Sequence, residues 1–257
     1  MDTLIDIKNL ILNLLGGFIV IIFERIYSYI KKHYVANKFK RLFGNDIKNK
    51  FYIVYGKLHL DNCYEKNGKY LKYPYYKDPN TRFTISEPIS FTETKSAKYF
   101  FESFSKNAKS SPILISDEEI KQKLDISYCS LGGYDNYKTI DILESSNLFN
   151  LDISEGQIVS RINNKTVYII DHKYDYALVI KQRNKYFPNR VQLCIAGLGE
   201  SGTSGAAWFV ANKWKEITRK VGKNNFECII KVEHNKDESA EIVDLMTEED
   251  IYRNKLY

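Results

Sequence analysis

Cysteine and histidine are both scarce, with four of each among 257 residues. The cysteines, at positions 63, 129, 194 and 228, form no C-x-x-C pair, and no histidines accompany them at the spacing of zinc ligands. This pattern excludes the common zinc modules, and we expect no bound metal. Three of the cysteines stand in apolar, strand-like runs, where a reduced thiol packs as a small hydrophobe. Reduced thiols indicate a reducing compartment.

The short signatures of several enzyme classes are also missing. No Walker A lysine follows a glycine loop, which argues against ATP hydrolysis of the P-loop type. There is no nucleophile elbow, no histidine pair at metal-ligand spacing and no clear pair of catalytic carboxylates. The sequence therefore favours a protein that is not an enzyme, without excluding one, and it indicates no cofactor.

Long charge-free apolar runs are rare as well, and the one that stands out lies near the N-terminus. Residues 9–23 carry no charge but are fewer than a membrane-spanning helix needs. Counting the apolar residues over 4–30 gives that length and includes Asp6, Lys8, Glu24 and Arg25 near the ends, where long side chains can reach the membrane surface. A cluster of lysine and arginine at 31–50 follows directly and is opposed only by Asp46. By the positive-inside rule we expect a single-pass protein of the inner membrane with a cytoplasmic C-terminal domain. The predicted segments are 1–42, the helix and basic stretch, and 43–257, the domain.

Two other interpretations of this run stay open. A secretory signal peptide would have a positive start and a cleavage site, whereas the chain begins with Asp2 and Asp6 and has no A-x-A motif here. A buried or amphipathic helix would tolerate the short run, but residues 10–23 show no clear polar face. Gly16 and Gly17 would allow close helix–helix approach, which suggests a homo-oligomer.

Alternating strand-like and helix-like runs predict an α/β domain. We expect strands at 51–60, 82–89, 111–116, 125–133, 175–184, 190–198 and 226–235, helices at 93–107, 117–124, 135–149 and 203–222, and hairpins turning at 67–68 and 163–164. This alternation predicts a Rossmann-like, largely parallel sheet with helices on both faces and a β-hairpin insertion. No repeat and no Pro-, Ser- or Gly-rich linker divides the domain.

Two loops, at 126–139 and 191–207, share one pattern, in which an apolar strand runs into glycines and the glycines run into a helix. Glycines let the backbone approach a ligand, and the free amides of a helix start attract negative charge. Such loops at the ends of parallel strands predict a site for a phosphate-bearing ligand, although glycines there also serve strand–helix packing. The expected ligand-binding residues are Gly132, Gly133, Asn136 and Thr139, then Gly197, Gly199, Gly202, Thr203 and Ser204, with Arg183 and Asn184 facing the same site if their strand is parallel.

The segments LGGYDNYKT, DYALVIKQRNKYFP and AGLGESGTSGAA together resemble bacterial Rossmann-like nucleotide-sensing domains of the SLOG type and the CARF-like sensors. The resemblance covers about residues 113–232. Such domains occur fused to transmembrane helices in anti-phage signalling, including the membrane-channel effector of Hailong-type systems. The resemblance implies ligand contacts at Gly132, Gly133, Asn136 and Thr139, and at Gly199, Gly202 and Thr203. The chain lacks the longer glycine-rich and acidic signature of the phosphoribohydrolases in that superfamily, which favours sensing.

Three functions follow from these patterns. The first is a membrane effector that senses a nucleotide or short oligonucleotide and gates or disrupts the membrane through an oligomer of N-terminal helices. The second is a membrane-tethered enzyme that hydrolyses a glycosidic bond in a nucleotide, with Asp171, His172 or Glu200 as acid or base. The third is a membrane protein whose glycines only pack.

Overall fold

A mixed seven-stranded sheet forms the centre of the domain. The computed structural model describes residues 2–48, 50–57, 64–66, 69–71 and 89–250, of which 2–16, 64–66 and 69–71 are described by their backbone alone. The strands of the sheet are β1 (Phe51–Tyr55), β4 (Ile113–Ser116), β5 (Ser127–Leu131), β9 (Tyr174–Arg183), β10 (Val191–Gly197), β11 (Phe226–Glu233) and β12 (Lys236–Thr247). Their order is β12-β11-β9-β10-β5-β1-β4. The pairs from β10 to β4 are parallel, and those from β12 to β10 are antiparallel.

Helices cover both faces of the sheet, as predicted. One face carries α1 (Asp2–Phe43), α2 (Phe91–Ala108), α5 (Glu200–Asn212) and α6 (Trp214–Val221), which share one hydrophobic core. The other face carries α3 (Asp117–Ile120), α4 (Tyr137–Ser145) and a small antiparallel sheet of β6 (Phe149–Asp152), β7 (Gln157–Ser160) and β8 (Thr166–Ile169). The predicted hairpin insertion is β7–β8, and Asn164 has the positive φ of 55° that such a turn requires.

Several predicted elements differ in detail. The strand at 175–184 runs antiparallel to its neighbours, and β12 was not predicted at all. The helix expected at 203–222 is divided at Lys213 into α5 and α6. The predicted turn at 67–68 and all but the last residue of the predicted strand at 82–89 lie outside the described residues. On either side of the turn, β2 (Tyr64–Lys66) and β3 (Lys69–Leu71) pair antiparallel. The fold is therefore a mixed α/β fold with the predicted layers.

The end of α1 lies at the centre of the hydrophobic core. Phe39, Leu42 and Phe43 have no exposed surface. The Phe39 ring stacks edge-on against Phe104 of α2 and Trp214 of α6, with centroids 5.0 and 5.2 Å apart. Burial of large aromatic side chains is among the strongest contributions to stability. The predicted boundary at residue 42 therefore falls inside the core, and the domain includes the last turns of α1.

A buried lysine fastens the end of α1 to the sheet. The Lys181 amine of β9 donates hydrogen bonds to the carbonyl oxygens of Arg41, Lys223 and Asn224, at 2.8, 3.0 and 3.2 Å. One of these acceptors belongs to the last turn of α1, where carbonyl groups have no partner within the helix. Burial lowers the pKa of Lys181 to about 8. The end of α1 is thus held by both packing and hydrogen bonds.

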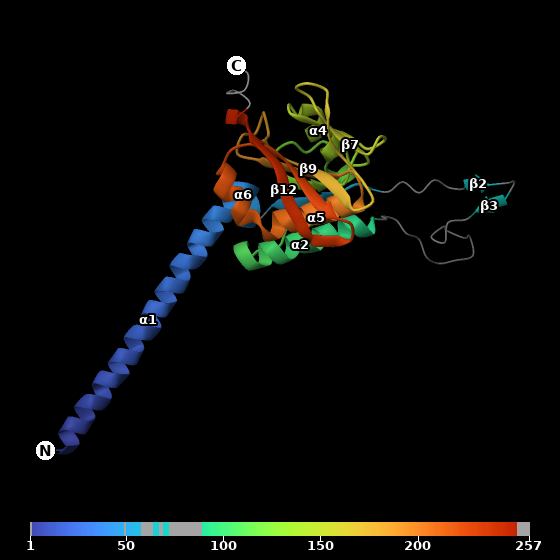
Figure 1. Cartoon of the computed structure of the whole chain (residues 1–257). Helices are drawn as coiled ribbons and strands as arrows, with labels where there is room; N and C mark the ends of the chain where they lie inside the picture. The colour runs from blue at the N-terminus through green and yellow to red at the C-terminus, as the bar shows by residue number, and fades with distance from the viewer. Residues whose placement is uncertain (1, 49, 58–63, 67–68, 72–88, 251–257) are drawn as a thin grey trace.

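The first part of α1 extends away from the domain as a single rod (Figure 1). Six consecutive apolar side chains, at 18–23, are at least 40% exposed, followed by exposed Ile26, Tyr27, Tyr29 and Ile30. Within the part of the chain that the structure describes, no helix is long and apolar enough to cross a membrane. Residues 4–16, on which much of the predicted membrane-spanning segment rests, lie in the stretch described by its backbone alone.

Candidate functional site

The ends of β1 and β5 lie side by side at the carboxyl edge of the parallel strands, because these two strands pair directly. After β1 the chain crosses to β4 on one side, whereas β5 leads through the small sheet toward β9 on the other. Open α/β sheets bind ligands at the point where successive connections diverge in this way. The groups at this point are Gly56 after β1, Gly132 after β5, and the first turn of α2.

Glu93 brings a buried carboxylate to this edge. It is 3% exposed, and its Oε1 accepts a hydrogen bond from the Gly56 amide at 3.0 Å. Ser90 caps α2 by accepting a bond from the Glu93 amide, and its hydroxyl donates to the Glu93 carboxylate. Burial raises the pKa of Glu93 to about 7, and the Asp135 carboxylate adds to the rise. Glu93 therefore changes its charge near neutral pH.

Gly132 lies against both carboxylates. Its φ of +93° favours glycine, and a Cβ atom there would stand 2.8 Å from Glu93 Oε1 and 3.4 Å from Asp135 Oδ1. A Cβ on Gly56 would stand 3.1 Å from the Asp135 carbonyl oxygen. We call Gly56, Glu93, Gly132 and Asp135 the carboxyl-edge cluster. Two neighbouring carboxylates can accept hydrogen bonds from hydroxyl groups or exchange a proton, and they repel phosphate.

The helix start after the first glycine loop is occupied by side chains of the protein. The Asn136 side chain accepts hydrogen bonds from the amides of Lys138 and Thr139, at 3.0 and 3.4 Å. The Tyr137 amide donates to Asp117 at 2.9 Å. The Asn136 amide group also donates to the carbonyl oxygens at the ends of β1 and β5. Asn136 therefore acts as a buried connector between two strands and α4.

The replacement Asn136→Asp tests this role. Aspartate caps helices as well as asparagine does, but here its carboxylate would face the carbonyl oxygens of Val54 and Leu131 without a proton to donate. We expect a loss of about 2 kcal/mol of unfolding free energy, measured by thermal melting in detergent. Asn150→Asp is the matched control, since Asn150 accepts a bond from Arg161 and should tolerate the charge. An unchanged melting temperature in Asn136→Asp would contradict the connector role.

At the start of α5, after the second glycine loop, the free backbone amides are likewise bonded to a side chain of the protein. The Asp175 carboxylate, 1% exposed, accepts hydrogen bonds from the amides of Gly199 at 3.1 Å and Gly202 at 2.6 Å, and from Tyr176 at 2.7 Å. This is the position that a phosphate takes at a helix start. Burial raises the pKa of Asp175, against the opposing effect of the three amides. The protein thus supplies its own anion to these amides.

The other predicted residues of the two loops make contacts within the protein. Thr203 Oγ1 accepts a bond from the Gly197 amide at 3.1 Å, and Ser204 Oγ donates to Asp237 at 2.8 Å. A Cβ on Gly133 would stand 2.7 Å from Ile153. Thr139 Oγ1 is buried and has no hydrogen-bond partner among the described residues. Both loops lie at the same edge of the sheet, but none of these contacts forms a phosphate cradle.

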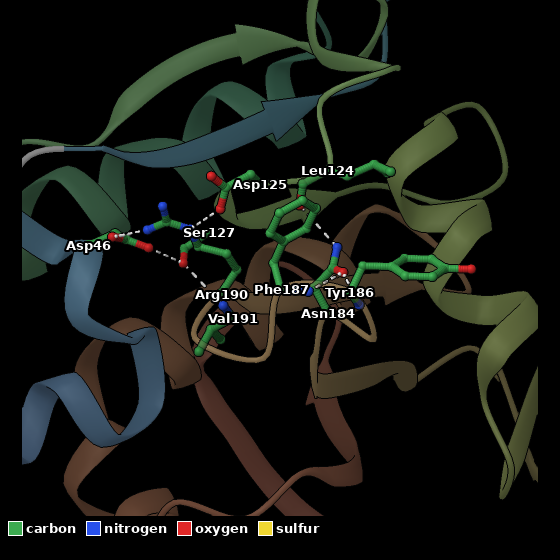
Figure 2. A network of polar contacts seen from close by, with 9 residues as sticks. All are labelled: Asp46, Leu124, Asp125, Ser127, Asn184, Tyr186, Phe187, Arg190 and Val191. Atoms are coloured by element: carbon green, nitrogen blue, oxygen red, sulfur yellow. Dashed lines mark hydrogen bonds and ion pairs between the residues drawn. The ribbon is translucent and has the colours of Figure 1, made fainter.

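Arg183 and Asn184 do not face this edge, because β9 runs antiparallel to β10. The prediction that they join the glycine loops is therefore wrong. Asn184 caps the turn after β9 and donates to the Leu124 carbonyl at 3.0 Å. By the pairing of Arg183 with Val191 it lies at the opposite edge, and Figure 2 shows it near the ion pairs that join Arg190 to Asp46 and Asp125. Ser127 completes that network by accepting a bond from the Val191 amide and donating to Asp46.

The residues considered for acid and base chemistry are mostly solvated. Asp171 accepts hydrogen bonds from the amides of Lys173 and Tyr174, which holds the turn before β9. His172 is exposed beside it, and Glu200 is exposed in the first turn of α5. Contacts with the turn amides lower the pKa of Asp171, so it stays ionised at neutral pH. No buried acid is formed by these three residues.

Glu93 and the role of Asp175 at the start of α5 are what the sequence did not predict. The Ser-x-x-Glu spacing of residues 90–93 is the signature of a capping box, and it marks where α2 begins. No comparable signal marks Asp175, which meets Gly199 only because β9 and β10 pair. Comparison of the chain with protein-family models, curated proteins and solved structures finds no match. The resemblance to SLOG-type and CARF-like sensors stays a prediction.

Proposed function

We propose that this protein is a membrane-attached sensor, in which a nucleotide-class ligand at the carboxyl-edge cluster acts through α2 on α1. One observation supports this proposal: α2 contacts both the carboxyl-edge cluster and the end of α1. Its first turn holds Glu93 against the end of β1, and its later turns carry Phe100 and Phe104 into the core around α1. The Phe43 ring of α1 lies 6.0 and 5.1 Å from these two rings. A shift of α2 at the cluster would therefore change the packing of its later turns against α1.

The chemistry of the cluster favours the nucleoside part of the ligand. Paired carboxylates accept hydrogen bonds from vicinal hydroxyl groups such as those of ribose. A phosphate would meet the like charge of Asp135 and, above neutral pH, of Glu93. The amides at both helix starts are already bonded to Asn136, Asp117 and Asp175. The proposal therefore keeps the predicted ligand class and assigns recognition to its sugar.

Membrane attachment is proposed for α1. Six consecutive apolar residues occupy every face of a helix, because each is rotated about 100° from the last. Such a surface, exposed over 18–23, is stable in lipid or against other copies of α1. The basic residues that follow favour a domain on the cytoplasmic side of the inner membrane. Gating of the membrane by several copies, in anti-phage defence, stays a prediction that rests on the resemblance.

The most direct way to identify the ligand is to look for a small molecule that co-purifies with the protein. We expect full-length protein purified in detergent to retain a small molecule that mass spectrometry identifies as a nucleoside or nucleotide. Addition of that molecule should raise the melting temperature of the wild type. Glu93→Gln should weaken this binding about tenfold, because one charged acceptor is lost. A ligand that binds equally well to the variant would place recognition elsewhere.

Coupling through α2 has a separate test in liposomes. Phe104→Leu should preserve ligand binding but reduce ligand-dependent ion leak several-fold, since it loosens the contact between α2 and Phe39 of α1. Phe209→Leu, a buried phenylalanine of α5, is the matched control and should leave the leak unchanged. Equal leak in both variants would show that α2 does not carry the signal.

A membrane-tethered hydrolase is the second candidate. Glu93 favours it, because an acid or base works best when its pKa lies near the working pH, and that of Glu93 is about 7. An enzyme would convert the bound nucleotide to free base and sugar, whereas a sensor would release it unaltered. Mass spectrometry of the ligand after incubation separates the two. Turnover that disappears in Glu93→Gln would favour the enzyme.

A further inference from the structure

Two hollows lined in part by basic residues lie beside residues 28–41 of α1, a segment that we call the root of α1. The first, of about 420 Å³, lies between α1 and the C-terminal end of α2. It is lined by Lys31 and Lys32 of α1, by Lys48, and by Lys106 and Lys109 at the end of α2. All five lysines are exposed, and no carboxylate is among the described residues that line the hollow. Three separate parts of the chain thus contribute lysines to the lining of one hollow.

The second hollow, of about 460 Å³, also touches α1. Lys40 and Arg41 of α1 line it together with Arg183 at the end of β9 and Lys223 in the turn before β11. Its described lining again includes no carboxylate. Arg183 therefore belongs to this basic surface and not to the glycine loops.

The cations of the first hollow make no ion pair with a carboxylate among the described residues. Like charges gathered without counter-ions raise the local potential, which an anionic partner relieves. Both hollows border α1 within residues 28–41, directly after its exposed apolar stretch. In Figure 1 the end of α2 and α6 lie beside α1 where the rod enters the domain.

We propose that these hollows form a docking face for the phosphate headgroups of anionic lipids, which seats the domain directly on the membrane surface. The inference rests on the proposed attachment of α1 to a membrane. It extends that proposal, because Lys48, Lys106, Lys109, Arg183 and Lys223 lie outside α1 and come from the folded domain. The position next to exposed apolar residues favours a lipid over a soluble anion, since an interfacial lysine meets headgroups at that depth.

The test measures the reactivity of individual lysines in the full-length protein. Wild-type protein is placed in nanodiscs of phosphatidylcholine alone or with phosphatidylglycerol, neither of which carries a primary amine. Acetylation is followed residue by residue with mass spectrometry. Lys48, Lys106 and Lys109 should react about fivefold more slowly with phosphatidylglycerol present, the change that one headgroup contact is worth. Lys165, exposed between β7 and β8, and Lys173, exposed between β8 and β9, should react equally in both.

A charge-reversed pair provides the second measurement. Lys106→Glu with Lys109→Glu should abolish the lipid-dependent protection of Lys48, because the shared anion is lost. Lys165→Glu with Lys173→Glu, matched in net charge, should preserve it. Equal reactivity of Lys48, Lys106 and Lys109 in both nanodiscs would overturn the docking face and leave the attachment of α1 standing.

Soluble anions distinguish the source of the phosphate. Inorganic phosphate or a single-stranded oligonucleotide, added to phosphatidylcholine nanodiscs, should protect these lysines less than phosphatidylglycerol does. Equal protection by either would overturn the lipid assignment in favour of a soluble ligand. Failure of the chain to enter nanodiscs of any composition would overturn the membrane attachment, and with it both proposals.

Discussion

Glu93→Gln should make the folded protein more stable above neutral pH, by about 3 kcal/mol at pH 8. Burial raises the pKa of Glu93 from 4.5 to about 7, so the folded state binds its proton more tightly than the unfolded state. Its favourable contribution is complete below about pH 4.5 and is lost as the pH rises through 7. Glutamine can still accept the bond from the Gly56 amide, but it has no charge to bury.

The pH dependence makes this prediction specific. At pH 5 the gain should shrink to less than about 1 kcal/mol, because folded Glu93 is then protonated. Melting curves of the full chain in detergent, followed by circular dichroism from pH 5 to 8, measure the difference. Glu102→Gln on the same helix is the control, since the Glu102 side chain is 64% exposed and should change little. A gain independent of pH would mean that Glu93 is not the titrating group.

A stabilising substitution at this position would have a functional meaning. A destabilising buried carboxylate with a strongly shifted pKa, such as Glu93 beside the end of β1, is a candidate for binding or catalysis. Glu93→Gln should also lower the affinity for the proposed ligand, so stability would rise while binding weakens. Parallel losses of both would instead indicate a structural role for Glu93.

Asp175→Gly should lower the unfolding free energy by about 4 kcal/mol at pH 7. The amides of Gly199, Gly202 and Tyr176 would lose the acceptor that all three share, at the buried start of α5. Acetate matches the missing side chain, so about 0.2 M acetate should restore about 1 kcal/mol, whereas neutral acetamide should not. Thermal melting in detergent with each additive measures both effects.

Asp171→Gly is the matched control for this experiment. Asp171 also accepts two backbone amides, but at an exposed turn where water replaces a lost partner. We expect a loss below about 1 kcal/mol and no response to acetate. Selective rescue of Asp175→Gly would show that the second glycine loop is an anion site whose anion is part of the chain. Rescue in neither variant would contradict that assignment.

Local patterns predicted most of the elements, because apolar periodicity and glycine position act over a few residues. The strands β5, β9, β10 and β11, the helix α4 and the β7–β8 hairpin all lie where those patterns indicate. The reversed direction of β9 left no local signal, since a strand buried on both faces has the same composition in either direction. That direction moved Arg183 and Asn184 to the opposite edge.

In the carboxyl-edge cluster, too, local sequence patterns predicted one part and tertiary contacts decided the rest. Gly132 lies in one of the predicted loops between a strand and a helix, and it takes the backbone conformation that favours glycine, whereas Gly56 falls inside the strand predicted at 51–60. The carboxylates that meet glycines in this cluster and at the second loop come from distant positions: Glu93 lies 37 residues from Gly56, and Asp175 lies 24 residues from Gly199. Only strand pairing and helix packing bring them together. The choice between a phosphate and a carboxylate as the anion at α5 was therefore made by tertiary contacts.

The sequence alone determined four features: the scarcity of cysteine and histidine, the α/β alternation, the two glycine loops, and the apolar N-terminal run with the basic stretch that follows it. Composition and short-range patterns are enough to identify each of them. The tertiary structure decided that α1 ends inside the core, that both helix starts are bonded to the protein's own side chains, and that lysines from three segments surround the root of α1. These features depend on charges and contacts between residues far apart in the chain, whose distances are set only when the sheet and its covering helices have formed.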